Sequence, residues 1–115
     1  MEYESVADLL ALLPELRNTP FMQIGAGSNL LFTRDFEGII LHSGLKGIEV
    51  KDDGDTVLLR AFSGETWDDV VAYAVQTGWS GMENLSAIPG EVGASAVQNI
   101  GAYGVEAQEL IVEME

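Results

Sequence analysis

The chain has 115 residues, of which 47 % are apolar and 21 % charged, and it contains no cysteine. These proportions are typical of a folded globular domain rather than a disordered segment. The missing cysteines exclude disulfides, thiolate metal sites and a cysteine nucleophile. The formal net charge of −14, with five scattered basic residues, argues against nucleic acid or an anionic membrane surface as a partner, because both need clustered positive charge.

The N-terminal segment predicts a short helix. Ser5 and Asp8 have the spacing of a capping box at a helix N-terminus. The apolar residues that follow suit a helix over residues 6–13, and Pro14 is expected to end it because proline cannot continue the backbone hydrogen bonds.

Short strands are expected next. Residues 21–24 and residues 39–42 read as strands, separated by extended chain and a turn at residues 35–38. The clearest hairpin is GIEVKDDGDTVLLRAF, residues 47–62, in which the Asp53-Gly54 step supplies the turn between two aliphatic runs.

The second half predicts two further helices. Thr66 is a suitable N-cap and Gly78 a suitable C-cap for a helix with helically spaced apolar residues. Residues 91–99 form a plausible short helix of small residues, and residues 110–115 read as the start of a strand. This order of elements predicts an α+β domain with a mixed or antiparallel sheet, rather than alternating βαβ units.

A glycine-rich segment, GAGSNL at residues 25–30, follows the first predicted strand. It is not a dinucleotide-binding Rossmann fingerprint, because Leu30 stands where the third glycine is needed and extended chain follows instead of a helix. Two interpretations remain. The two glycines can take positive φ and aim successive N–H groups at one anion, helped by Ser28 and Asn29, or the segment is an ordinary tight turn. In so acidic a chain, a phosphorylated ligand would have to be held by backbone N–H groups and helix ends.

A second glycine-rich segment, IPGEVGASAVQNIGAYG, covers residues 88–104. Its residues 93–96 would give a helix a face nearly free of side chains, suited either to close packing or to a flat ligand or diphosphate. Gln98 and Asn99 each carry a donor and an acceptor, the pair needed to read the edge of a heterocycle, although Asn99 is better placed to cap the helix. Tyr103 can stack on a ligand ring or simply pack.

The remaining candidates have structural explanations. His42 is the only histidine and ends an apolar strand, so a structural role is favoured over a catalytic one. Trp67 and Trp79 fit the core side of a helix and its end. No nucleophile–base pair, metal-ligand spacing or acid–base dyad can be assembled, so the sequence indicates a binding site without catalytic residues.

The two glycine-rich segments carry a resemblance to a known family. GAGSNLLF and GMENLSAIPGEVGASAVQNIGAYGVE together resemble the UDP-N-acetylenolpyruvoylglucosamine reductases of peptidoglycan synthesis, the MurB enzymes. The match covers nearly all of this chain but only the middle of the family enzyme. It implies a truncated FAD-binding domain over residues 1–115, without the substrate-binding domain, and an α+β fold of the p-cresol methylhydroxylase type.

The resemblance also implies which residues contact FAD. In the family the glycine loop cradles the diphosphate, and the second segment wraps the flavin and the rest of the diphosphate. Carried over by position, the implied cofactor-binding residues are Gly25, Ala26, Gly27, Ser28, Asn29, Leu30, Glu83, Ile88, Pro89, Gly93, Ala94, Gln98, Asn99, Gly101, Ala102, Tyr103 and Gly104. No catalytic residue is implied, since the family's arginine, serine and glutamate would lie beyond Glu115.

The implied reaction is the NADPH-dependent reduction of the enolpyruvyl double bond of a UDP-sugar, giving UDP-N-acetylmuramate in the cytoplasm. The chain alone is expected to be inactive, and unpaired strand edges invite self-association. Two alternatives remain open. One is the FAD-binding domain of another flavoprotein oxidoreductase of the same domain family, and the other is a non-catalytic acidic protein-interaction domain.

Overall fold

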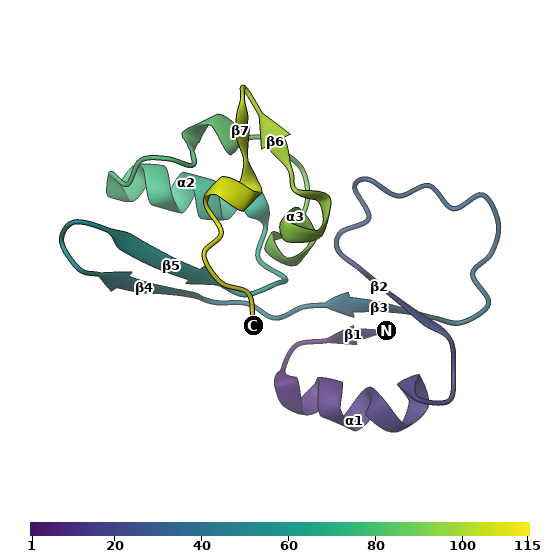
Figure 1. Cartoon of the computed structure of the whole chain (residues 1–115). Helices are drawn as coiled ribbons and strands as arrows, with labels where there is room; N and C mark the ends of the chain where they lie inside the picture. Colours follow the sequence, from purple (N-terminus) through teal and green to yellow (C-terminus); the bar gives the residue numbers. More distant parts are fainter.

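The computed structural model describes all 115 residues and shows an α+β arrangement of one parallel sheet and two small antiparallel pairs (Figure 1). The two longer helices have 11 residues each, and no helix has the length and apolar character needed to cross a bilayer. In chain order the elements are β1 (Glu2–Tyr3), α1 (Val6–Leu16), β2 (Phe21–Ile24), β3 (Ile39–Ser43), β4 (Ile48–Asp52), β5 (Val57–Ala61), α2 (Trp67–Thr77), η1 (Glu83–Leu85), α3 (Val92–Gln98), β6 (Gly101–Ala102), β7 (Val105–Glu106) and η2 (Ala107–Glu109).

The first sheet is parallel, with β3 lying between β1 and β2. His42 on β3 is level with Glu2 on one side and with Ile24 on the other. β1, α1 and β2 therefore form a crossover unit, with α1 on one face of the sheet (Figure 1). The α+β class is as predicted, but this one parallel crossover was not expected, because a two-residue strand such as β1 leaves no recognisable sequence pattern.

The alternation along β3 decides which face of this sheet is covered. Ile39 and Leu41 are buried, at 9 % and 2 % exposure, and form an apolar cluster with Tyr3 and Leu16. Since successive side chains on a strand point to opposite faces, His42 lies on the face away from this cluster. That orientation turns His42 toward the second half of the molecule.

Helix α1 begins as predicted but runs past Pro14. The Ser5 hydroxyl accepts a hydrogen bond from the Asp8 N–H at 3.1 Å, which caps the N-terminus. The predicted end at Pro14 is wrong by two residues. Proline deprives the Leu10 carbonyl of its donor, but Leu10 is 59 % exposed, so water can replace that donor. Continuing the helix buries Leu16 in the apolar cluster.

The hairpin of β4 and β5 is formed as predicted. Asp52 on β4 pairs with Val57 on β5, and Gly54 takes a φ of +88° in the turn between them. The Gly54 N–H donates to the Asp52 carboxylate at 2.8 Å, which fixes the turn. Positive φ suits glycine at this position because it has no Cβ.

A second apolar cluster forms around helix α2. Trp67, Val71 and Leu85 are at most 4 % exposed, and the Trp67 indole N–H donates to the Leu85 carbonyl at 2.8 Å. Gly78 ends the helix in the left-handed conformation, as predicted. Thr66 occupies the N-cap position without a side-chain hydrogen bond, and its backbone instead bridges to Glu91.

The strand expected at residues 110–115 is not present. Leu110 and Ile111 follow η2 in a turn held by hydrogen bonds to the Ala107 carbonyl, and no strand pairs with the residues after them. A strand needs a neighbouring backbone with which to exchange hydrogen bonds, and this segment has none. Leu110 instead packs at the edge of the second apolar cluster.

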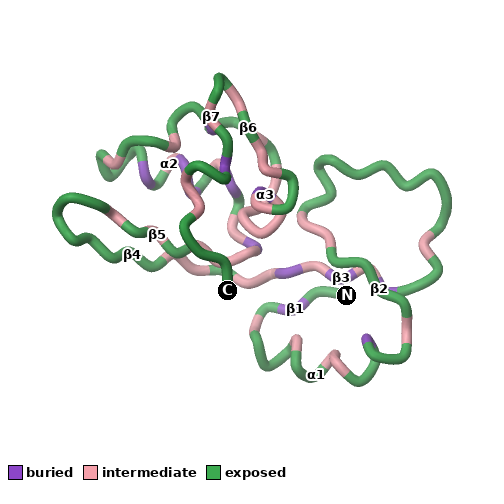
Figure 2. Tube along the Cα trace, in the orientation of Figure 1, coloured by how far each residue is buried: buried purple, intermediate pink, exposed green.

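The two apolar clusters do not merge into one core. Only 13 of the 115 residues are buried, and the apolar clusters built on Leu41 and on Trp67 have no buried residue in common. Figure 2 shows how few positions along the trace are buried. The radius of gyration of 15.8 Å exceeds the roughly 13 Å of a compact domain of this length. The chain therefore has two small apolar cores in place of one.

Candidate functional site

The two glycine-rich segments meet in the structure. We call residues 25–30 the glycine loop and residues 88–104 the second glycine segment. The Asn29 amide donates to the Gln98 side-chain oxygen at 2.9 Å across 69 residues of sequence, and the Ser28 hydroxyl donates to the Pro89 carbonyl at 3.3 Å across 61. The two segments that the resemblance assigns to one cofactor are therefore in direct contact.

The glycine loop approaches helix α3 closely enough to require a missing side chain. A Cβ atom at Gly25 would lie 2.8 Å from the Ala94 Cβ, well inside van der Waals contact. Positive φ was expected at both loop glycines, but only Gly27 has it, at +74°. Gly25 thus serves close approach, and Gly27 serves the bend of the loop.

Close packing also explains Gly93 on α3. A Cβ atom there would lie 2.8 Å from the Ser63 Cβ, and the Gly93 N–H donates to the Ser63 carbonyl at 2.9 Å. Of the two interpretations of this small-residue face, packing therefore holds at Gly93. The face toward the glycine loop, at Ala94, remains available to a ligand.

A cavity of about 430 Å³ lies between the glycine loop and α3; we call it the loop cavity. Its size falls in the range of small-molecule sites, about 300–1,000 Å³. Nine of the residues carried over from the family line it: Gly25, Ala26, Gly27, Ser28, Asn29, Leu30, Gly93, Ala94 and Gln98.

The glycine loop supplies most of the unused backbone donors of this cavity. The backbone N–H groups of residues 26–29 donate no hydrogen bond within the chain. The first two N–H groups of α3 are already used, by the carbonyls of Glu65 and Ser63 at 2.9 Å each. The third N–H of α3, that of Ala94, donates no hydrogen bond within the chain, and Ala94 lines the cavity. The unused donors at this cavity therefore come from the loop and from one position at the helix start, as expected for an anion held by backbone N–H groups.

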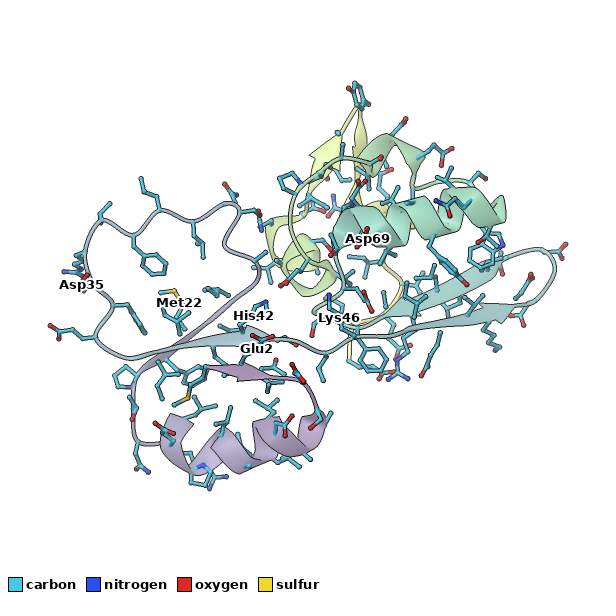
Figure 3. The ribbon with its side chains drawn as sticks, turned by 180° about the vertical axis from the view of Figure 1, so that it is seen from behind. Glu2, Met22, Asp35, His42, Lys46 and Asp69 are labelled. Carbon is cyan, nitrogen blue, oxygen red and sulfur yellow. The ribbon has the colours of Figure 1, made fainter.

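The opposite wall of the cavity carries a negative charge. The Glu91 carboxylate lines the cavity and lies 3.0 and 3.1 Å from His42 Nε2 through its two oxygens. His42 Nδ1 is 3.7 Å from a Glu2 oxygen, and Figure 3 shows His42 and Glu2 side by side where the two halves of the molecule meet. His42 thus links β3 to α3, and no lysine or arginine lines the cavity.

The other eight residues carried over from the family lie outside the loop cavity: Glu83, Ile88, Pro89, Asn99, Gly101, Ala102, Tyr103 and Gly104. Asn99 is the C-cap of α3, with a φ of +46°, and its amide donates to Glu106 at 2.9 Å. Ile88 packs against the second apolar cluster. Capping and packing roles therefore account for these two positions.

The 101–104 turn projects away from the cavity. Gly101 and Ala102 form strand β6, and Tyr103 at its tip is 89 % exposed. The structure thus gathers the glycine loop and α3 into one site and leaves this turn as a separate exposed feature.

Glu83, in η1, is also outside the cavity. Its carboxylate accepts a hydrogen bond from the Gly81 N–H at 2.5 Å, and its own backbone N–H, followed by that of Gly81, holds the pKa of Glu83 below its usual value.

Seven cavity residues were missed by sequence reasoning: Tyr3, Gln23, Ile24, Ser43, Ser63, Glu91 and Val97. Tyr3, Ile24 and Ser43 share a physical origin. They end β1, β2 and β3, and the parallel register aligns them at one edge of the sheet. Ligands in open parallel sheets bind outside the carboxyl ends of strands, so this rule would have found them once the sheet was known to be parallel.

Asp68 holds the turn that leads into the second glycine segment. Its carboxylate accepts hydrogen bonds from the Ala87 N–H at 2.6 Å and from the Ser86 hydroxyl at 2.9 Å. Ala87 has a φ of +59°, a conformation that alanine seldom adopts without support. The hydrogen bond from Ala87, followed by that from Ser86, lowers the pKa of Asp68.

We expect Asp68→Asn to flatten the loss of stability in acid. A lowered folded-state pKa means that the contribution of Asp68 is complete above its unfolded pKa of about 3.9 and is lost as the pH falls through the folded value. Urea midpoints measured between pH 7 and pH 3 should therefore fall less steeply below pH 4 in the variant. Asp69→Asn is the matched control, since Asp69 is exposed on the same helical turn. Equal slopes for Asp68→Asn and the unaltered chain would contradict the assignment.

Comparison with known proteins agrees with this geometry. The family model for an FAD binding domain matches residues 1–115. The chain belongs to this FAD-binding domain family. FAD is accordingly its cofactor, and the glycine loop of this FAD-binding domain is the part of the cavity whose free N–H groups suit a diphosphate.

Relatives of this FAD-binding domain carry one name, UDP-N-acetylenolpyruvoylglucosamine reductase. The protein from Bacteroides fragilis is 57 % identical over 117 residues, which is 100 % of this chain and 35 % of that protein. The protein from Porphyromonas gingivalis is 54 % identical over 114 residues, or 96 % of this chain and 34 % of that protein. The Chromobacterium violaceum protein is 48 % identical, over 98 % and 34 % respectively. The chain thus spans about a third of the length of the relatives that it matches.

The residues of the FAD-binding domain fit the cofactor. A diphosphate needs several convergent donors, and residues 26–29 present unused N–H groups without any competing backbone acceptor. Gly25 has no side chain where one would separate the loop from Ala94. When bound, FAD supplies the ability to accept and release a hydride. The chain itself binds and orients the cofactor.

Proposed function

We propose that this chain is the FAD-binding part of a UDP-N-acetylenolpyruvoylglucosamine reductase, the enzyme that uses NADPH to reduce a UDP-sugar enolpyruvyl ether to UDP-N-acetylmuramate. The proposal rests on the meeting of the two glycine-rich segments through Asn29 and Gln98, with unused N–H groups in between. Identities of 48–57 % over nearly the whole chain support that enzyme over another flavoprotein of the same domain family.

The proposal assigns binding, not turnover, to residues 1–115. They would constitute one FAD-binding domain of the p-cresol methylhydroxylase type, acting in the cytoplasm. NADPH and the UDP-sugar would be partners of the complete enzyme, and no catalytic residue is assigned here. The residues proposed to contact FAD are the seventeen carried over from the family, with the nine around the loop cavity as the principal set.

Self-association through strand edges is part of the proposal. Strand β2 is an edge of the parallel sheet, and Phe21 and Met22 on it are 51 % and 37 % exposed. Figure 3 places Met22 beside the long loop that follows β2. An exposed apolar edge offers unpaired backbone groups to a second chain.

The proposal predicts that the purified chain takes up flavin. After incubation with FAD and removal of free cofactor by desalting, the visible absorption spectrum of the protein should show the flavin bands at close to one equivalent. Riboflavin, which lacks any phosphate, is the control ligand and should be lost on desalting, because the loop N–H groups then have no anion to bind. A chain that is folded by circular dichroism but retains no FAD would contradict the proposal.

A further inference from the structure

Glu91 is the one charged residue in the wall of the loop cavity, and no role has been assigned to it. Its side chain is only 13 % exposed. Glu91 lines the loop cavity and also a second cavity of about 490 Å³, which it shares with His42 and Lys46. A carboxylate in a cavity proposed to hold a diphosphate needs a physical explanation, because the two charges repel.

His42 fixes the position of the Glu91 carboxylate but occupies only part of its hydrogen-bonding capacity. Both Glu91 oxygens lie within 3.1 Å of His42 Nε2, so they share a single N–H donor. An ionised carboxylate accepts at about four lone-pair positions. Acceptor capacity therefore remains on the side that faces the loop cavity.

The loop cavity has a donor end and an acceptor end. A Glu91 oxygen lies 3.3 Å from the position that a Cβ at Gly25 would occupy, so the carboxylate lies at the first residue of the glycine loop. The unused N–H groups of the loop belong to residues 26–29. An anion is favoured toward the later part of the loop, and a neutral O–H donor is favoured next to Glu91.

We propose that Glu91 is a specificity-determining residue that accepts a hydrogen bond from a sugar or sugar-alcohol hydroxyl of the bound cofactor, and that His42 is the residue that positions it. The inference rests on the proposed function, since it takes FAD in the loop cavity as given. A dinucleotide has such hydroxyls on both sides of its diphosphate. The ribityl chain lies toward the flavin, and the ribose lies toward the adenine.

The test is calorimetric titration of the purified chain with FAD, FMN, ADP and inorganic pyrophosphate. Glu91→Gln removes the charge at nearly constant shape. Glu91→Gln should lower the affinity for FAD about fivefold to tenfold, because a hydrogen bond to a charged acceptor is replaced by a weaker one. The same variant should raise the affinity for inorganic pyrophosphate about twofold to fivefold, because a repulsive charge is removed. If the affinity for FMN falls along with that for FAD while the affinity for ADP does not, the hydroxyl belongs to the ribityl chain. If the affinity for ADP falls along with that for FAD while the affinity for FMN does not, it belongs to the ribose.

Two further variants separate positioning from folding. Glu65→Gln is the matched control, because its side chain is 18 % exposed and does not line the loop cavity, and it should leave all four affinities unchanged. His42→Leu should reduce the preference for FAD over pyrophosphate, and His42→Gln, which keeps an N–H donor, should restore most of it. A structural role alone would change both affinities in the same direction.

The outcomes distinguish this inference from the function on which it rests. If the unaltered chain binds FAD and Glu91→Gln changes no affinity, or weakens all four ligands equally, the role of Glu91 is refuted while the FAD site stands. If the unaltered chain binds none of the four ligands, the proposed function fails and the inference fails with it.

Discussion

A chain carrying Gly27→Val should bind FAD at least tenfold more weakly than the unaltered chain. Gly27 has a φ of +74° and nothing within 4 Å of the position that a Cβ would take. The effect is therefore conformational rather than steric crowding. Placing a β-branched residue in the left-handed region costs about 1–2 kcal/mol or more. We expect the loop to relieve this strain by rotating its peptide planes, which changes the directions of the unused N–H groups of residues 26–29. Flavin fluorescence titration measures the loss.

The matched control for this variant is Gly54→Val in the β4–β5 turn. Gly54 has a φ of +88° and equally open surroundings, so the conformational strain is of the same kind. It lies in the hairpin turn and lines no part of the loop cavity. The two variants should lose similar stability toward urea, while only Gly27→Val loses flavin. Equal flavin affinity in both variants would show that the glycine loop is an ordinary turn, as its second interpretation holds.

A large loss of stability is expected from Gly64→Ala. Gly64 is buried between the end of β3 and the start of α2, and its Cβ would collide with the Ser43 carbonyl and lie 2.8 Å from the Leu45 carbonyl. Backbone atoms cannot move aside as a side chain can, so we expect a loss of about 3 kcal/mol from overpacking. Thermal unfolding followed by circular dichroism should show a fall in Tm of roughly 10 °C.

Gly101→Ala provides the graded comparison. Its Cβ would lie 3.1 Å from the Val105 carbonyl, a milder approach than at Gly64, and the residue is exposed. Its Tm should fall by a few degrees at most, in keeping with a loss below about 1 kcal/mol. A Tm for Gly64→Ala equal to that of Gly101→Ala would mean that the contact between β3 and the segment before α2 is looser than the structure shows.

The elements that sequence reasoning found are those with a local signal. Ser5 caps α1, Gly78 ends α2 in the left-handed conformation, and Asn99 ends α3, all as predicted. Each of these depends on the chemistry of a few neighbouring residues. The hairpin of β4 and β5 was found for the same reason, since its turn residues lie between its strands.

The parallel sheet was missed because its pairings are not local. Strand β1 has two residues, and its partner β3 lies about 40 residues further along the chain. Two residues, Glu2 and Tyr3, are too few to show the alternating pattern that predicts a strand. The cavity residues at the ends of these strands were missed as a consequence, although the glycine loop itself was found from its own composition.

In the site too, features with a local sequence signal were predicted and contacts between distant residues were not. Each glycine-rich segment was identified as a candidate binding element, but the hydrogen bond between Asn29 and Gln98 depends on the folding of everything between them. Glu91 begins the helix expected over residues 91–99 and was given no binding role. Its place against Gly25 and His42 follows from packing α3 on the parallel sheet, which no local pattern encodes.

The two separate apolar clusters have a consequence for how the chain unfolds. The glycine loop follows the sheet built on one cluster, and α3 packs beside the other, so we expect the cavity walls to belong to two cooperative units. The contacts between the units include the hydrogen bonds Ser43–Ser63 and His42–Glu91. Units joined in this way can open independently. A ligand that touches both walls binds only when both are folded, so it merges two unfolding transitions into one. The bound cofactor would then provide the contacts between the two units that a shared apolar core provides in other domains.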